Sequence, residues 1–274
     1  MSGTLDGDPL LLVLVGVALG ALGLAVGSFL NVLIHRVPEG RSVIRPASAC
    51  PSCGTPISAR DNIPILSWLL LRGRCRSCGA RISARYAVVE ALTALVWLGL
   101  GWWALAADQL PLLPWLLVLG SACVALTFID LEHHRLPDAI VFPLYPAGVV
   151  GLVIAGLFGG RWPLVDAAIG VGIWLVVIGG LWLISGGRGM GFGDVKLAPI
   201  LGATLGWVAV AAASVGLFAA FTLAAVVGIV LMAARRAGRR SHIPFGPFLV
   251  VGAAVGLVSG QAIWEAYTGM MSGQ

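Results

Sequence analysis

The sequence predicts an all-α protein that crosses a membrane about eight times and carries a small four-cysteine domain after its first helix. Of the 274 residues, 59% are hydrophobic and only 11% are charged, whereas soluble domains usually contain about 25% charged residues. Apolar runs of about 20 residues, the length that crosses a bilayer, recur along the chain. The polar segment after the first run holds two Cys-x-x-Cys pairs. A single soluble core could not bury this much apolar surface, so we expect a polytopic membrane protein.

The expected membrane spans follow one another with short polar connections. The sixth and seventh spans are divided at Gly206-Trp207, because residues 196–232 are too long for one crossing. Three regions result: the first helix (1–35), a four-cysteine domain (36–85) and a membrane core (86–274). In chain order the spans cover residues 10–34, 86–106, 112–129, 139–158, 164–184, 196–206, 207–232 and 245–264.

The distribution of basic residues predicts the orientation in the membrane. If alternate connections face the cytosol, every Lys and Arg except Arg161 lies in segments 36–85, 131–138, 186–196 and 235–243. Short cytosolic connections carry an excess of Lys and Arg. We therefore expect both termini outside, with the four-cysteine domain on the cytosolic side.

Two aspartates stand out against this apolar background. Asp130 ends the third apolar run, and Asp194 follows the glycine-rich stretch Gly189-Met190-Gly191-Phe192-Gly193. Span parity puts both at the cytosolic edge, and carboxylates in a membrane protein are functional candidates by default. Two facing aspartates share a proton, so one can activate water while the other polarises a peptide carbonyl.

The two aspartates and their neighbours each have a functional and a purely structural interpretation. Gly189, Gly191 and Gly193 would let a substrate backbone come close, because none of them has a side chain. The alternative is that each aspartate only caps a helix or ends a span. Asp138 is expected to be the N-cap of the fourth span, with a supporting role near Asp130 as the second interpretation. His133 and His134 are expected to be solvated.

The cysteines fall into two groups. Cys50, Cys53, Cys75 and Cys78 form two Cys-x-x-Cys-Gly pairs, whereas Cys123 lies alone in an apolar run and should be a small core residue. Four thiolates satisfy tetrahedral zinc and close its coordination, so the metal would be structural. Disulfides are disfavoured in the cytosol, and a redox role or an accidental pairing of the motifs remains as the alternative.

The partners expected from composition are limited. Arginines are frequent in the four-cysteine segment, but no aromatic residues alternate with them, so we expect contact with the lipid bilayer and not with nucleic acid. The glycines at 186–193 follow an apolar helix and no strand, which argues against a dinucleotide-binding loop.

Several stretches together resemble the bacterial type IV prepilin peptidases. The similarity extends over most of the chain and includes both cysteine pairs. The other stretches that carry it are Gly27–Val32, Asp61–Trp68, Ile82–Tyr86 with Glu90, Asp130–Asp138, Gly191–Lys196 and Ile243–Phe248.

The resemblance implies a membrane aspartyl endopeptidase of the Gly-x-Gly-Asp kind. Asp130 and Asp194 would be the catalytic pair, and Gly191, Gly193, Lys196 and Asp138 would be motif or substrate-positioning residues. The implied location is the cytoplasmic (inner) membrane, and the implied substrates are prepilins or pseudopilins, cut at the cytosolic face after the last glycine of the leader. Many members also methylate the new N-terminal amine with S-adenosylmethionine, for which the sequence identifies no binding residues.

Two other classes of protein remain as alternatives. A transporter or proton-coupled channel could use the same carboxylates, although it would place charges near the middle of the membrane. A non-catalytic assembly protein could use the four-cysteine domain for docking. The sequence leaves open the cognate pilin, its pathway and the oligomeric state.

Overall fold

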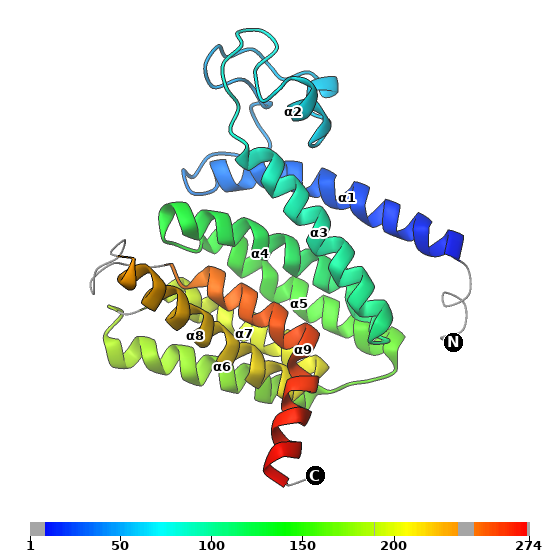
Figure 1. The fold of residues 1–274 in the computed structure, drawn as a ribbon, viewed down its shortest axis with the longest axis vertical. Helices are drawn as coiled ribbons and strands as arrows, with labels where there is room; N and C mark the ends of the chain where they lie inside the picture. The colour runs from blue at the N-terminus through cyan, green and yellow to red at the C-terminus, as the bar shows by residue number, and fades with distance from the viewer. Residues whose placement is uncertain (1–8, 189, 235–243, 273–274) are drawn as a thin grey trace. The chain divides into compact units, whose positions relative to one another are not determined.

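The computed structural model describes residues 9–188, 190–234 and 244–272, and these residues form helices joined by turns and loops, without a β-strand (Figure 1). The chain divides into two compact units, Met1–Ala125 and Leu126–Gln274. In order, the elements are α1 (Pro9–Arg36), the 3₁₀ turn η1 (Ala59–Asp61), α2 (Leu66–Leu70), α3 (Arg85–Ala106), η2 (Leu110–Leu112), α4 (Leu113–His133), α5 (Asp138–Gly159), α6 (Leu164–Ser185), α7 (Phe192–Val208), α8 (Val210–Ala233) and α9 (Gly246–Ser272).

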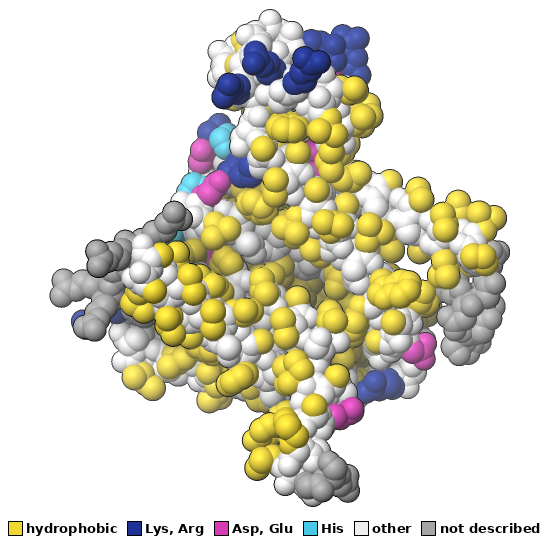
Figure 2. All heavy atoms as spheres, in the orientation of Figure 1, with side chains coloured by type: hydrophobic (Ala, Val, Ile, Leu, Met, Phe, Trp, Pro, Cys, Tyr) yellow, Lys and Arg dark blue, Asp and Glu magenta, His cyan; other side chains and the backbone are white. Residues whose placement is uncertain are grey.

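The polytopic membrane class is confirmed. Within the described residues, 7 helical segments are long and apolar enough to cross a bilayer. They correspond to seven of the eight expected spans, and the remaining one corresponds to α7, which is shorter at 17 residues. Hydrophobic side chains cover much of the helical surface in Figure 2, as a lipid-exposed surface requires.

Two boundaries differ from the sequence expectation. The break between the sixth and seventh spans lies at Ala209, which is extended with φ −166° and ψ 147°, and not at Gly206-Trp207. The expected position was wrong because Gly206 and Trp207 are still helical and are buried near the end of α7. Gly206 lies against the backbone of Asp166 in α6, and the ring of Trp207 meets that of Trp162 edge-on. Helix α7 also begins at Phe192 and not at Lys196, so Asp194 lies in its first turn.

In the first unit, glycines allow close packing of α1 against α3. A Cβ at Gly23 would lie 2.8 Å from the Cα of Ala94, and one at Gly27 would lie 2.7 Å from the Cα of Glu90. Glycines four residues apart let membrane helices approach through their backbones. The four-cysteine segment runs from the end of α1 to the start of α3, so this contact holds its two attachment points together.

The four-cysteine segment folds around two similar turns. The amide of Gly54 donates to the carbonyl of Cys50 at 2.8 Å, and that of Gly79 donates to Cys75 at 2.9 Å. Both glycines have positive φ, +69° and +71°, which a residue with a side chain rarely adopts. The glycine after each cysteine pair is therefore required by the turn itself.

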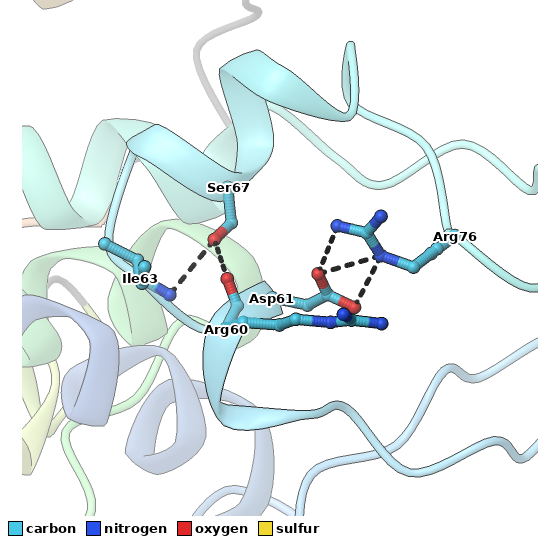
Figure 3. A network of polar contacts seen from close by, with 5 residues as sticks. All are labelled: Arg60, Asp61, Ile63, Ser67 and Arg76. Atoms are coloured by element: carbon cyan, nitrogen blue, oxygen red, sulfur yellow. Dashed lines mark hydrogen bonds and ion pairs between the residues drawn. The ribbon is translucent and has the colours of Figure 1, made fainter.

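An ion pair ties the second cysteine turn to η1. The guanidinium of Arg76 donates from Nε and Nη2 to the carboxylate of Asp61, at distances from 2.6 to 3.0 Å (Figure 3). Hydrogen bonds from Arg76 lower the pKa of Asp61 below its usual value. The ion pair therefore stabilises the fold at pH values above the ordinary aspartate pKa. This stabilisation is lost as the pH falls through the lowered pKa of Asp61.

In the second unit, α7 is the central helix and contacts α5, α6, α8 and α9. Gly202 of α7 lies directly against Gly170 of α6, with no space for a side chain on either. Helices α8 and α9 pack in the same way through Gly216 and Gly252. Close packing around α7 holds its N-terminal turn, and hence Asp194, in a fixed position.

Candidate functional site

The structure brings Asp130 and Asp194 together within the second unit. Asp130 is near the end of α4, Asp194 is in the first turn of α7, and each residue is only 5% exposed. Their carboxyl groups are close enough to interact electrostatically. Neighbouring buried carboxyl groups share a proton because both cannot easily be ionised.

A backbone amide holds the Asp130 carboxylate in place. The amide of Gly246, the first residue of α9, donates to Oδ2 of Asp130 at 3.0 Å in a buried hydrogen bond. A Cβ at Gly246 would lie 2.7 Å from that same oxygen, which is closer than real Cβ contacts occur. Position 246 therefore has to be glycine if the carboxylate is to stay where it is. The amides at the N-terminus of a helix also favour a negative charge there.

Leu136 fills the space between the helix ends that carry the site. It is buried in the connection from α4 to α5. A Cβ at Gly193 would lie 2.8 Å from the Cβ of Leu136, and one at Gly246 would lie 3.4 Å from its Cδ2. Gly193 is thus required by the packing of Leu136, whereas at Gly246 the leucine is only in ordinary contact distance and the close contact is with Asp130.

The two glycines before Asp194 have different surroundings. Gly191 is exposed, and the nearest atom to a Cβ there would be Oδ2 of Asp194, at an ordinary contact distance of 3.5 Å. Room for a substrate backbone at Gly191 therefore remains a prediction. At Gly193 the space is already occupied by Leu136.

Lys196 connects α7 to α5. Its ammonium pairs with the carboxylate of Asp138, and it lies 4.9 and 5.4 Å from the ring centres of Phe192 and Phe142. The hydroxyl of Tyr145 donates to the carbonyl oxygen of Lys196 at 2.8 Å. The N-cap expectation for Asp138 was wrong: Pro137 occupies the cap position, and Asp138 is the first helical residue, turned toward Lys196.

His133 and His134 are both exposed, and the lone Cys123 is buried in α4, as expected for each. His134 has a φ of +51° and lies just beyond the end of α4. Gly189, Ile243 and the basic segment 235–243 were part of the sequence argument but lie outside the described residues, as do residues 1–8 and the last two residues.

A second candidate site is formed by Cys50, Cys53, Cys75 and Cys78. One ligand atom from each lies within 4.8 Å of all the others, so the four thiols converge as a metal site requires. Hydrogen bonding with the side chain and backbone of Thr55 lowers the pKa of Cys53 to about 6. Four sulfur donors fit zinc, which prefers tetrahedral thiolate coordination.

Sequence reasoning missed the roles of Gly246 and Leu136. Gly246 stood within the stretch Pro244-Phe245-Gly246-Pro247, where a glycine between bulky residues and prolines at the start of an apolar helix was the available signal. Leu136 carried no signal, because one buried leucine in an apolar protein looks like any other. Only three-dimensional contacts identify these two residues.

The helical fold and the paired aspartates define a multi-pass membrane protein with the carboxyl groups that aspartyl proteases use. The chain belongs to the type IV leader peptidase family, whose sequence model matches residues 117–233. Residues 21–104 match the bacterial peptidase A24 N-terminal domain. The second match contains Asp130 and Asp194, and the first contains all four paired cysteines.

Similar proteins from several bacteria carry the name prepilin leader peptidase/N-methyltransferase. The protein from Aeromonas salmonicida is 40% identical over 89% of this chain and 90% of its own length. Those from Neisseria gonorrhoeae and Pseudomonas aeruginosa are 36% and 35% identical, with about 90% of each chain covered. No solved structure matches.

Proposed function

We propose that this protein is a membrane aspartyl endopeptidase that removes the leader peptide of prepilins or pseudopilins. The observation that carries the proposal is the buried pair Asp130 and Asp194, held at adjoining helix ends. Membership of the leader peptidase family and the names of the similar proteins support the same activity. They give no support to the alternatives of a transporter or a non-catalytic assembly protein.

The surroundings of the two carboxyl groups suggest different roles for them. Asp130, which accepts the Gly246 amide, is the ionised member and takes a proton from the attacking water. Asp194 is protonated and donates to the oxygen of the scissile carbonyl. The oxygen of the water adds to the carbonyl carbon and gives a tetrahedral diol. When the diol collapses, Asp130 passes its proton to the leaving amine as the C–N bond breaks, and one diol hydroxyl returns a proton to Asp194, so that both carboxyl groups are restored.

Four neighbouring residues support this pair. Gly191 leaves open the space beside Asp194, and Gly193 admits Leu136. Lys196 and Asp138 join α7 to α5 two residues beyond Asp194. We assign Lys196 and Asp138 the role of positioning the first turn of α7, which carries Asp194 and would orient the substrate. Neither residue takes part in proton transfer.

The second proposed activity is methylation of the amine that cleavage exposes. S-adenosylmethionine would supply the methyl group, and the names of the similar proteins support this half of the proposal. We assign no residue to the methyl donor. The four cysteines would hold a structural zinc ion whose closed coordination leaves no position for substrate.

The proposed location is the cytoplasmic membrane, with the four-cysteine segment and the aspartate pair on the cytosolic side. The supporting observation is that nearly all Lys and Arg residues lie in connections that share one side if there are eight crossings. A basic leader on that side would place the scissile bond near the two aspartates.

Cleavage of a prepilin-like substrate in membrane vesicles tests this proposal directly. Asp130→Asn and Asp194→Asn should each abolish cleavage, because each removes one proton-transferring group. Asp108→Asn is the matched control, since Asp108 is exposed in the connection after α3 and should retain full activity. With S-adenosylmethionine present, the mature product should be heavier by one CH₂ group. Cleavage that survives either of the first two substitutions refutes the paired-aspartate mechanism.

A further inference from the structure

Glu90 is a buried carboxylate that the proposed reaction does not use. It lies in α3, is 8% exposed, and accepts a hydrogen bond of 2.7 Å from the amide of Ile65. The side chain of Ser28 in α1 is a second hydrogen-bonding partner. A carboxylate inside a membrane span is costly and marks a specific interaction. Here the partner is the backbone of the four-cysteine segment.

This contact fixes the depth of Ile65 along α3. Glu90 is five residues beyond the first residue of α3, a distance of about 7.5 Å along the helix axis at 1.5 Å per residue. Ser28 is eight residues before the end of α1, or about 12 Å along that helix. Ile65 therefore lies beside the interior of two membrane helices, below the level at which the chain leaves α1 and enters α3.

The backbone around Ile65 has the hydrogen bonds that such a depth demands. Polar backbone groups within the bilayer must be satisfied by the protein. Ile65 itself has an unusual φ of +57°, and Glu90 accepts its amide. The amide of Ile63 donates to Oγ of Ser67 at 3.1 Å, and the Ser67 hydroxyl donates to the carbonyl of Arg60 at 3.0 Å (Figure 3).

Helix α2 turns its leucines away from the protein. Leu66, Leu69 and Leu70 are spaced so that they share one face, and all three are exposed, Leu70 by 74%. On the other side Ser67 is buried, and Nε1 of Trp68 donates to the carbonyl of Ile82 at 3.2 Å. Figure 2 shows most basic side chains of this segment away from α1 and α3, with hydrophobic side chains between them and the two helices.

We propose that residues 63–70 form a re-entrant element whose α2 leucines insert into the acyl-chain boundary of the lipid bilayer, with Glu90 anchoring it to α3. Its exposed apolar face continues that of α3, where Val88 and Leu92, on either side of Glu90, are also exposed. The occupant of this face is lipid. This inference is independent of the proposed protease activity, because it concerns only the first unit.

Photo-crosslinking in native membranes tests the insertion with the full-length protein. Benzoylphenylalanine replacing Leu70 should give phospholipid adducts after irradiation, identified by mass spectrometry. The same group replacing Leu95, exposed in the middle of α3, is the positive control. Replacement of Ile57, whose amide bonds Ser48 in the first cysteine turn, should give none. Adducts at Leu70 to a protein in place of lipid, or no adduct there while Leu95 is labelled, overturn the proposal.

Two substitutions test the anchor. Glu90→Gln keeps an acceptor for the Ile65 amide and should preserve lipid labelling at Leu70. Glu90→Leu removes the acceptor and should cause loss of most labelling at Leu70, while labelling at Leu95 stays unchanged and shows that α3 is still inserted. Equal labelling at Leu70 in both variants would show that Glu90 does not anchor the element.

Discussion

Asp130 is positioned by the backbone amide of another helix, a contact that one added methyl group would break. Removal of a hydrogen bond to a charged group costs about 1.5–3 kcal/mol. Gly246→Ala keeps both aspartates but puts a Cβ where Oδ2 of Asp130 now lies. We expect the cleavage rate to fall roughly 10- to 100-fold.

Initial rates in vesicles, with enzyme amounts matched, would measure this loss. Gly228→Ala is the control, because a Cβ at Gly228 in α8 would meet no atom within 4 Å. Wild-type rates in both variants would mean that the Gly246 contact has no catalytic importance.

The pair of Lys196 and Asp138 makes a second prediction about single residues. Lys196→Met and Asp138→Asn should each slow cleavage by loosening α5 from the start of α7. Residues that act through one contact are not additive. We therefore expect the double variant to be no slower than the worse single variant, as measured by kcat/KM. Losses that multiply in the double variant would mean that the two residues act separately.

At the scale of elements, we expect the four-cysteine segment to depend on a bound metal ion. Zinc binds thiolates and not thiols, so we expect about one zinc per chain at neutral pH and its release as the pH is lowered. Without zinc, the turns around Cys50 and Cys75 lose the link that joins them, and proteolysis within residues 37–84 should become faster.

Metal analysis of purified variants separates this site from other cysteines. Cys53→Ser should lose the zinc, whereas Cys123→Ser should retain it, because Cys123 lies buried in α4 and is not one of the four convergent cysteines. Zinc retained after loss of Cys53 would exclude four-thiolate coordination.

Most elements could be predicted from the sequence because membrane helices have strong compositional signals. Runs of about 20 apolar residues predicted α1, α3, α4, α5 and α6 to within a few residues. The division between α7 and α8 was harder, since Ala209 is as apolar as its neighbours and nothing in its residue type signals its extended backbone.

The candidate site could be predicted in part. Charged residues are rare enough in an apolar chain that Asp130 and Asp194 are conspicuous, and span parity predicts that they lie on one side. Gly246 lies 116 positions from Asp130 along the chain. No local pattern relates the two, and the contact that joins them is to a backbone amide, which leaves no trace in residue type beyond the glycine itself.

For the whole molecule, the main untested prediction is its orientation. In inside-out vesicles, protease should reach the four-cysteine segment, and in right-side-out vesicles it should not. The connection at Arg161, between α5 and α6, should show the opposite accessibility. The same accessibility for both connections would contradict the eight-span arrangement, because it would require one crossing fewer or more between them.

The shortness of α7 has a consequence for the supply of water to the reaction. Its 17 residues span about 26 Å, against about 30 Å for the hydrocarbon core of a typical bilayer. Helix α7 is enclosed by α5, α6, α8 and α9, of which α6 and α8 have 22 and 24 residues. A central helix shorter than those around it would leave space for water beside its first turn, where Asp194 lies. Bulk solvent entering there would reach the depth of the carboxyl groups. Cleavage should then slow as the enzyme is placed in bilayers of longer acyl chains, which ties the rate of hydrolysis to the thickness of the host membrane.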